Sequence, residues 1–141
     1  MRAAPQLADG EEILHHHTPD IGAFKRTALL MLAITLVPTV MFVVFIPDTF
    51  WGAVPLFITC LLLMQERFTL GKYAAWITNR RVLMQGDVEH VLSDITSVET
   101  IGTAVRLNHT GGRTKLFYPK DKAALKGIIE TAMNAARSEA T

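Results

Sequence analysis

Two long stretches without a charged residue dominate the first half of the chain. Residues 27–47 carry no charge over 21 positions, residues 49–65 carry none over 17, and Asp48 alone separates them. A helix needs about 20 apolar residues to cross the hydrocarbon core of a bilayer, whereas apolar runs of 10 to ~14 residues are more typical of core helices. The sequence therefore predicts two transmembrane helices over residues 27–46 and 49–65, of which the second is the shorter, with a re-entrant second arm as the alternative.

The basic residues beside these runs indicate how the helices are oriented. Lys25 and Arg26 precede the first run, Arg67 and Lys72 follow the second, and residues 47–49 between the runs contain no basic residue. Because basic residues are retained on the cytoplasmic side, we expect a helical hairpin with both termini in the cytoplasm. A signal peptide would have a shorter apolar region, without a second apolar run directly after it.

Two prolines and one alternative fold bear on this apolar segment. Pro38 and Pro55 lie within the two runs, and a proline inside a helix usually produces a kink. A soluble protein with two unusually apolar buried helices is the alternative to a membrane hairpin.

The remaining composition argues against several classes of function. Cys60 is the only cysteine, so the chain has neither an internal disulfide nor a pair of thiols for a metal. Residues 66–141 contain eleven Lys and Arg against eight acidic residues. A nucleic-acid-binding surface has a denser basic patch with exposed aromatic residues. We therefore expect no metal, no cofactor and no nucleic-acid partner.

Beyond Lys72 the chain changes to short β-favouring stretches separated by turn residues. Val105 and Leu107 alternate with Arg106 and Asn108, which is the pattern of a strand with one buried face. This predicts an antiparallel meander. Its expected strands are residues 72–78, 81–85, 88–92, 95–101, 104–108 and 113–118, with a hairpin loop at residues 109–112.

The hydrophobic period changes again near the C-terminus. The residues that follow one helical face are Leu125, Ile128, Ile129, Ala132, Met133 and Ala136. Asp121 is suited to be the N-cap of this helix, and its apolar stripe should pack on the sheet. The expected fold class is therefore α+β, with an N-terminal transmembrane helical hairpin, an antiparallel sheet and a C-terminal amphipathic helix.

Three segments resemble the bacterial membrane-anchored pleckstrin-homology-like (PH-like) family. They are GEEIL at residues 10–14, ITNRRVL at residues 77–83 with the following Gly86, and DITSV at residues 94–98. The resemblance extends from Gly10 to the final helix. It implies a PH-like sheet or partial barrel after the hairpin, in a protein of the bacterial inner (cytoplasmic) membrane.

This resemblance also indicates how the chain is divided. Residues 1–23 would be a cytoplasmic N-terminal segment, residues 24–70 the hairpin and residues 71–141 the cytoplasmic PH-like domain. A PH-like barrel normally has seven strands, and the meander supplies only six. Residues 13–17 are the candidate for the missing strand.

His15, His16 and His17 form the most conspicuous polar run. In a strand His15 and His17 share a face, and two imidazoles can begin a zinc or copper site. Since no third ligand is evident, a partly exposed polar segment is the better interpretation.

Two groups of basic residues are candidates for contact with lipid or a partner. Arg80 and Arg81 occupy the first turn of the meander, where guanidinium groups either bind lipid phosphates or simply mark the cytoplasmic side. The second group consists of Arg113, Lys115, Lys120, Lys122 and Lys126. Each would contribute ~1 kcal/mol on an anionic bilayer that it faced, and a solvated face is the alternative.

No set of residues has the pattern of a catalytic site. Ser93 and Ser97 have no identifiable His and Asp partners, and the acidic residues form no evident pair. Residues 109–112 lack the Gly-Lys-Ser/Thr ending of a phosphate-binding loop. We therefore expect a protein that is not an enzyme.

Together these observations favour a membrane-tethered PH-like interaction module. The resemblance implies an assembly factor or accessory subunit of a membrane protein complex, bound to a membrane-protein partner or to a second copy of itself. The alternative is a module that binds or senses anionic lipid at the cytoplasmic face of the membrane.

Overall fold

The computed structural model describes residues 4–141, which form two compact units. One unit, called here the helical unit, contains residues 21–70. The other, called the sheet unit, contains the chain up to Asp20 together with residues 71–141. The chain therefore starts in the sheet unit, passes through the helical unit and returns.

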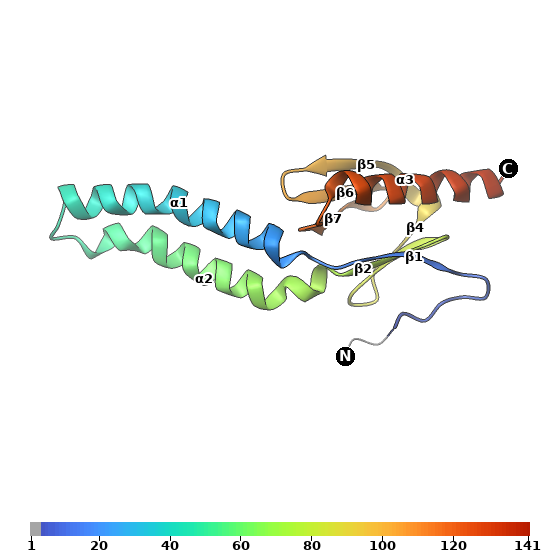
Figure 1. The fold of residues 1–141 in the computed structure, drawn as a ribbon, viewed down its shortest axis with the longest axis horizontal. Helices are drawn as coiled ribbons and strands as arrows, with labels where there is room; N and C mark the ends of the chain where they lie inside the picture. The colour runs from blue at the N-terminus through green and yellow to red at the C-terminus, as the bar shows by residue number, and fades with distance from the viewer. Residues whose placement is uncertain (1–3) are drawn as a thin grey trace. The chain divides into compact units, whose positions relative to one another are not determined.

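The helical unit is an antiparallel pair of helices (Figure 1). Helix α1 spans Ile21–Phe45, and helix α2 spans Val54–Thr69 after a short 3-10 helix, η1, at Phe50–Ala53. At its far turn, a Cβ atom on Gly52 would lie 2.7 Å from the Cβ of Phe42, so the close approach of α1 and η1 requires a glycine.

Both apolar helices are long enough to cross a bilayer. Helix α1 has 25 residues, or about 37 Å of helix. The second span, Phe50–Tyr73, has 24 residues because η1 precedes α2 and the 3-10 helix η2, Leu70–Tyr73, follows it. Only 6% of the apolar window in each span is buried, whereas a core helix of a soluble protein is mostly buried. The alternative of two buried core helices is therefore not supported.

The boundaries of these helices differ from the expected ones. Helix α1 begins six residues before residue 27, and α2 continues past residue 65 to Thr69. Helical hydrogen bonding does not stop where apolar composition stops, so the polar flanks remain helical. The expectation for Pro55 was wrong, since it lies in the first turn of α2, where a missing N–H costs nothing. Pro38 does lie inside α1.

The described part of the sheet unit contains seven strands in two antiparallel sheets and one long helix. The first sheet has the order β1 (Ile13–His17), β2 (Ala75–Thr78), β3 (Arg81–Met84) and β4 (Glu89–Val91). After the 3-10 helix η3 (Leu92–Asp94), the second sheet has the order β5 (Ile95–Ile101), β6 (Ala104–His109) and β7 (Gly112–Phe117). All six strands of the expected meander are present, and the two sheets do not form one closed barrel.

Strand β1 supplies the seventh strand and determines how the two units are connected. It pairs antiparallel with β2, with His17 opposite Ala75 and His16 opposite Trp76. The helical unit is therefore the connection between two paired strands. The first expected strand begins at Ala75 rather than residue 72, because Leu70–Tyr73 forms the 3-10 helix η2.

Helix α3 (Lys122–Glu139) completes the core of the sheet unit. Asp121 is its N-cap, as expected, and its carboxylate accepts hydrogen bonds from the N–H groups of Ala123 and Ala124 at 2.9 and 3.1 Å. The buried face of α3 packs on residues from both sheets. The core consists mainly of Ile77, Val82, Leu92, Ile95, Val105, Leu107, Leu116, Leu125 and Ile129.

Candidate interaction site

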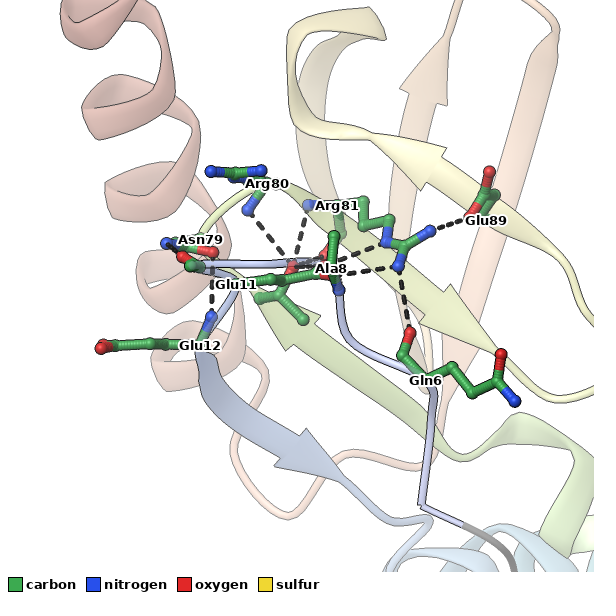
Figure 2. Close-up of polar contacts among 10 residues, drawn as sticks. Gln6, Ala8, Glu11, Glu12, Asn79, Arg80, Arg81 and Glu89 are labelled. Atoms are coloured by element: carbon green, nitrogen blue, oxygen red, sulfur yellow. Dashed lines mark hydrogen bonds and ion pairs between the residues drawn. The ribbon is translucent and has the colours of Figure 1, made fainter.

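A buried carboxylate holds the N-terminal segment against the turn between β2 and β3 (Figure 2). The side chain of Glu11 has no exposed surface. Its two oxygens accept hydrogen bonds from Nε and Nη2 of Arg81, both at 2.9 Å. They also accept from the Thr78 hydroxyl at 2.7 Å and from the Ala8 N–H at 2.8 Å. This bidentate arrangement is the strongest geometry for an arginine and a carboxylate.

These contacts keep Glu11 ionised and engage the guanidinium group of Arg81 in hydrogen bonds within the protein. The hydrogen bond from Arg81 is the main cause that lowers the pKa of Glu11 to about 2, against the opposing effect of burial. Arg81 also pairs with Glu89 and donates to the carbonyl of Gln6 at 3.2 Å. Its guanidinium group is therefore committed to the protein rather than presented to a lipid phosphate.

The rest of the Thr-Asn-Arg-Arg turn has a similar structural role. The Thr78 hydroxyl accepts from the N–H groups of Arg80 and Arg81, at 3.2 and 3.0 Å. The Asn79 side chain accepts from the Glu12 N–H at 3.1 Å and donates to the Gly10 carbonyl at 3.2 Å. The residues that carry the family resemblance thus join the segment before β1 to this turn. The side chain of Arg80 is exposed.

The outward face of the second sheet brings three basic residues together. Lys115 on β7 is opposite Arg106 on β6, and Arg113 is opposite Asn108 in the next row. Directly opposed residues in an antiparallel pair share a face. Glu99 on β5 lies 3.6 Å from Arg106 and offsets part of the charge. The buried Nε of Arg106 has no hydrogen-bond partner among the described residues. We call Arg106, Arg113 and Lys115 the basic face.

Aromatic residues lie at one end of the basic face. The rings of Tyr73 and Phe117 are 4.8 Å apart. The Lys115 amine lies 6.0 Å from the Phe117 ring, and the Lys72 amine lies 5.3 Å from the Tyr73 ring. Lys72 and Tyr73 are the last two residues of the second apolar span, so this end of the face is close to α2 along the chain. Aromatic and basic residues in that position are typical of a membrane interface.

The other candidate basic residues lie elsewhere. Lys122 donates to the Gly102 carbonyl at 2.6 Å, and Lys126 pairs with Glu130 one turn along α3 at 3.6 Å. Lys120 is exposed just before α3. The seven candidates therefore do not act as one surface, since Arg81 and Lys122 make internal contacts and only Arg113 and Lys115 share the basic face.

The three consecutive histidines have separate environments. His16 stacks on Trp76 with the rings 4.8 Å apart, and His17 is buried with Nε2 3.1 Å from the Phe117 carbonyl. Burial lowers the pKa of His17, so its neutral form is favoured. Among the residues described, no group of three or more His, Cys, Asp or Glu could hold a metal ion.

A second histidine cluster was not expected from the sequence. His90 on β4 and His109 on β6 have ring centroids 4.1 Å apart, and the Thr114 hydroxyl on β7 lies 2.9 and 3.0 Å from their Nε2 atoms. These contacts join the two sheets. Burial, and then the neighbouring His109, lower the pKa of His90.

Comparison with protein-family models, curated proteins and solved structures finds no match to this chain. The structure itself defines the class: an α+β protein with an apolar helical hairpin between two paired strands of its sheet unit.

Replacing Arg81 should destabilise the sheet unit strongly. Arg81→Met leaves the buried Glu11 carboxylate without its cationic partner, so the free energy of opening should fall. The double variant Glu11→Leu with Arg81→Met should recover most of that loss. The measurement is the free energy of opening of β1 and β2 from amide hydrogen exchange, with Arg80→Met as the matched exposed control. Equal effects of Arg81→Met and Arg80→Met would contradict the role assigned to this ion pair.

The same pair should make stability depend on acid pH. The folded-state pKa of Glu11 is about 2 and its usual value is 4.5. The contribution of Glu11 to the free energy of opening is therefore complete above pH 4.5 and is lost as the pH falls toward 2. In Glu11→Gln, which cannot ionise, the opening free energy measured over this range should change less than in the unmodified protein. Identical pH profiles would contradict this assignment.

The histidine pair predicts a second pH dependence at milder acidity. The pKa of His90 in the folded protein is below its usual value of 6.5. The contribution of neutral His90 to the free energy of opening is therefore complete above pH 6.5 and is lost as the pH falls below 6.5. The pKa of His17 is lowered as well, so His17 also makes stability fall at acid pH. His90→Gln should therefore reduce the dependence of the opening free energy on pH only in part. Ring-proton NMR titration of His90 is the direct measurement, and a midpoint at or above 6.5 would contradict the prediction.

Proposed function

We propose that this chain is a non-enzymatic, membrane-tethered interaction module of PH-like type, which acts as an assembly factor or accessory subunit for a partner membrane protein. One observation carries the proposal: an exposed apolar hairpin joins two paired strands of a folded unit. Exposed apolar surface of that length is stable in lipid, not in water.

The position of the hairpin supports a tether with both ends on one side of the membrane. Its two ends enter β1 and β2, whose residues His17 and Ala75 are paired. A chain that leaves and returns at one place must cross the bilayer twice or not at all. Lys25, Arg26 and Arg67 lie at the end of the hairpin that joins the sheet unit. Basic residues are retained in the cytoplasm, so the hairpin would cross the bacterial inner membrane with the sheet unit on its cytoplasmic side.

The sheet unit supports the PH-like assignment and the interaction role. Seven strands divided four and three, followed by one helix, agree with the strand number that the resemblance implies. The strands at the sheet edges, β1, β4, β5 and β7, offer backbone groups to which a partner can add a strand. The apolar helices offer a second contact surface within the lipid.

Isolation of the full chain tests this proposal. The protein should sediment with membranes after cell lysis without detergent, and in mild detergent it should co-purify with one membrane protein in constant stoichiometry. Recovery from the soluble fraction would contradict the tether. Recovery from detergent as a bare monomer would contradict the accessory role.

A second candidate function is recognition of anionic lipid, and the basic face favours it. Arg106, Arg113 and Lys115 share one outward surface, and Lys72 and Tyr73 connect its aromatic end with the apolar span. Basic residues near an anionic bilayer contribute ~1 kcal/mol each.

Reconstitution in nanodiscs tests lipid recognition. Acetylation of the Lys115 amine by a water-soluble reagent should be slower in phosphatidylglycerol than in phosphatidylcholine, because anionic headgroups cover the basic face. Arg106→Gln with Arg113→Gln should remove this difference, as should high salt. Lys126 on α3 is the control, and an equal lipid effect on Lys115 and Lys126 would contradict recognition by the basic face.

A further inference from the structure

An open groove runs between strand β1 and helix α3. Two adjoining hollows of about 570 and 500 Å³ share Ala124 and Ile128, and together they follow the length of the helix. We call this the β1–α3 groove. Leu14 lies on the strand side and is 51% exposed.

Small residues form the helix side of the groove. Ala124, Gly127, Thr131 and Ala135 recur at intervals of three and four residues, so they lie on one face of α3. All four are exposed. A Cβ atom placed on Gly127 meets nothing within 4 Å. There is space over this face for the main chain of another segment.

The strand side of the groove offers backbone hydrogen bonds. Strand β1 lies at the end of its sheet and, among residues 4–141, pairs with β2 alone. The unpaired N–H and C=O groups on the free edge of such a strand bind an extended segment by strand addition. The five residues of β1 extend about 17 Å, so they match a segment of similar length.

Opposite charges at the two ends of the groove restrict which segment fits. Lys120 lines the end near His17, and Glu139 lines the other end beside Asn79. Asp121 also lies near Lys120, but its carboxylate caps α3. A complementary segment has an apolar centre, an acidic residue near Lys120 and a basic residue near Glu139.

We propose that the β1–α3 groove binds an extended segment of the partner membrane protein, which adds a strand to β1 and places apolar side chains over the small residues of α3. This inference rests on the proposed function, since it identifies where and how the partner binds. The groove selects for extended conformation, apolar side chains and flanking charges of opposite sign.

Substitutions at Gly127 test the proposal without disturbing the fold. Gly127→Leu fills the groove, whereas Gly127→Ala adds only a methyl group, and both residues are better helix formers than glycine. A photo-crosslinking amino acid at Thr131 of the full chain, in native membranes, should attach to one segment of the partner, which mass spectrometry identifies. Gly127→Leu should reduce the yield at least ~10-fold, the equivalent of a tenfold weaker complex, and Gly127→Ala should leave it nearly unchanged.

The outcomes separate this inference from the proposed function. An extended apolar segment with the stated flanking charges supports it. If the partner co-purifies but Gly127→Leu retains both partner and crosslink, the groove assignment is overturned and the accessory role stands. Crosslinks only to lipid, or to a second copy of this chain, overturn it as well. If nothing co-purifies with the unmodified protein, the proposed function fails first.

Discussion

The antiparallel pairing of β1 with β2 is the constraint on which the rest of this structure depends. It joins the start of the chain to a strand that follows the whole apolar hairpin, so the ends of a long connection must meet. Closing such a connection costs conformational entropy, which the contacts between the strands and their flanking residues must offset. The paired strands also require the two apolar helices to form a hairpin, because the chain leaves and returns at neighbouring positions.

The Glu11–Arg81 ion pair fixes the other end of this pairing. Both charges are engaged by several hydrogen bonds, which is the condition under which a buried pair is tolerated. Removing Arg81 leaves the buried Glu11 charge without a cationic partner, so the pair holds the N-terminal segment in one position. The Thr-Asn-Arg-Arg turn, which from sequence suggested a site for lipid phosphate, is thus largely a part of the architecture.

This arrangement leaves two chemically distinct surfaces on the sheet unit. The basic face of β6 and β7 carries net positive charge and adjoins the rings of Phe117 and Tyr73. The β1–α3 groove has small residues of α3 on one side and a free strand edge on the other, and it carries opposite charges at its ends. The first surface suits an anionic bilayer and the second suits a protein segment, so the two proposed roles use separate regions of the sheet unit.

Features that are encoded within a few neighbouring residues could be predicted from the sequence alone. The apolar runs, the six strands of the meander, the stripe on α3 and the Asp121 cap follow from local composition, period and turn residues. Contacts between distant residues could not be predicted in this way and are known from the folded structure. Glu11 and Arg81, His90 and His109, and the two sides of the β1–α3 groove each come from separate elements. Their juxtaposition depends on strand order and register, which are set by packing of the whole unit rather than by local preference.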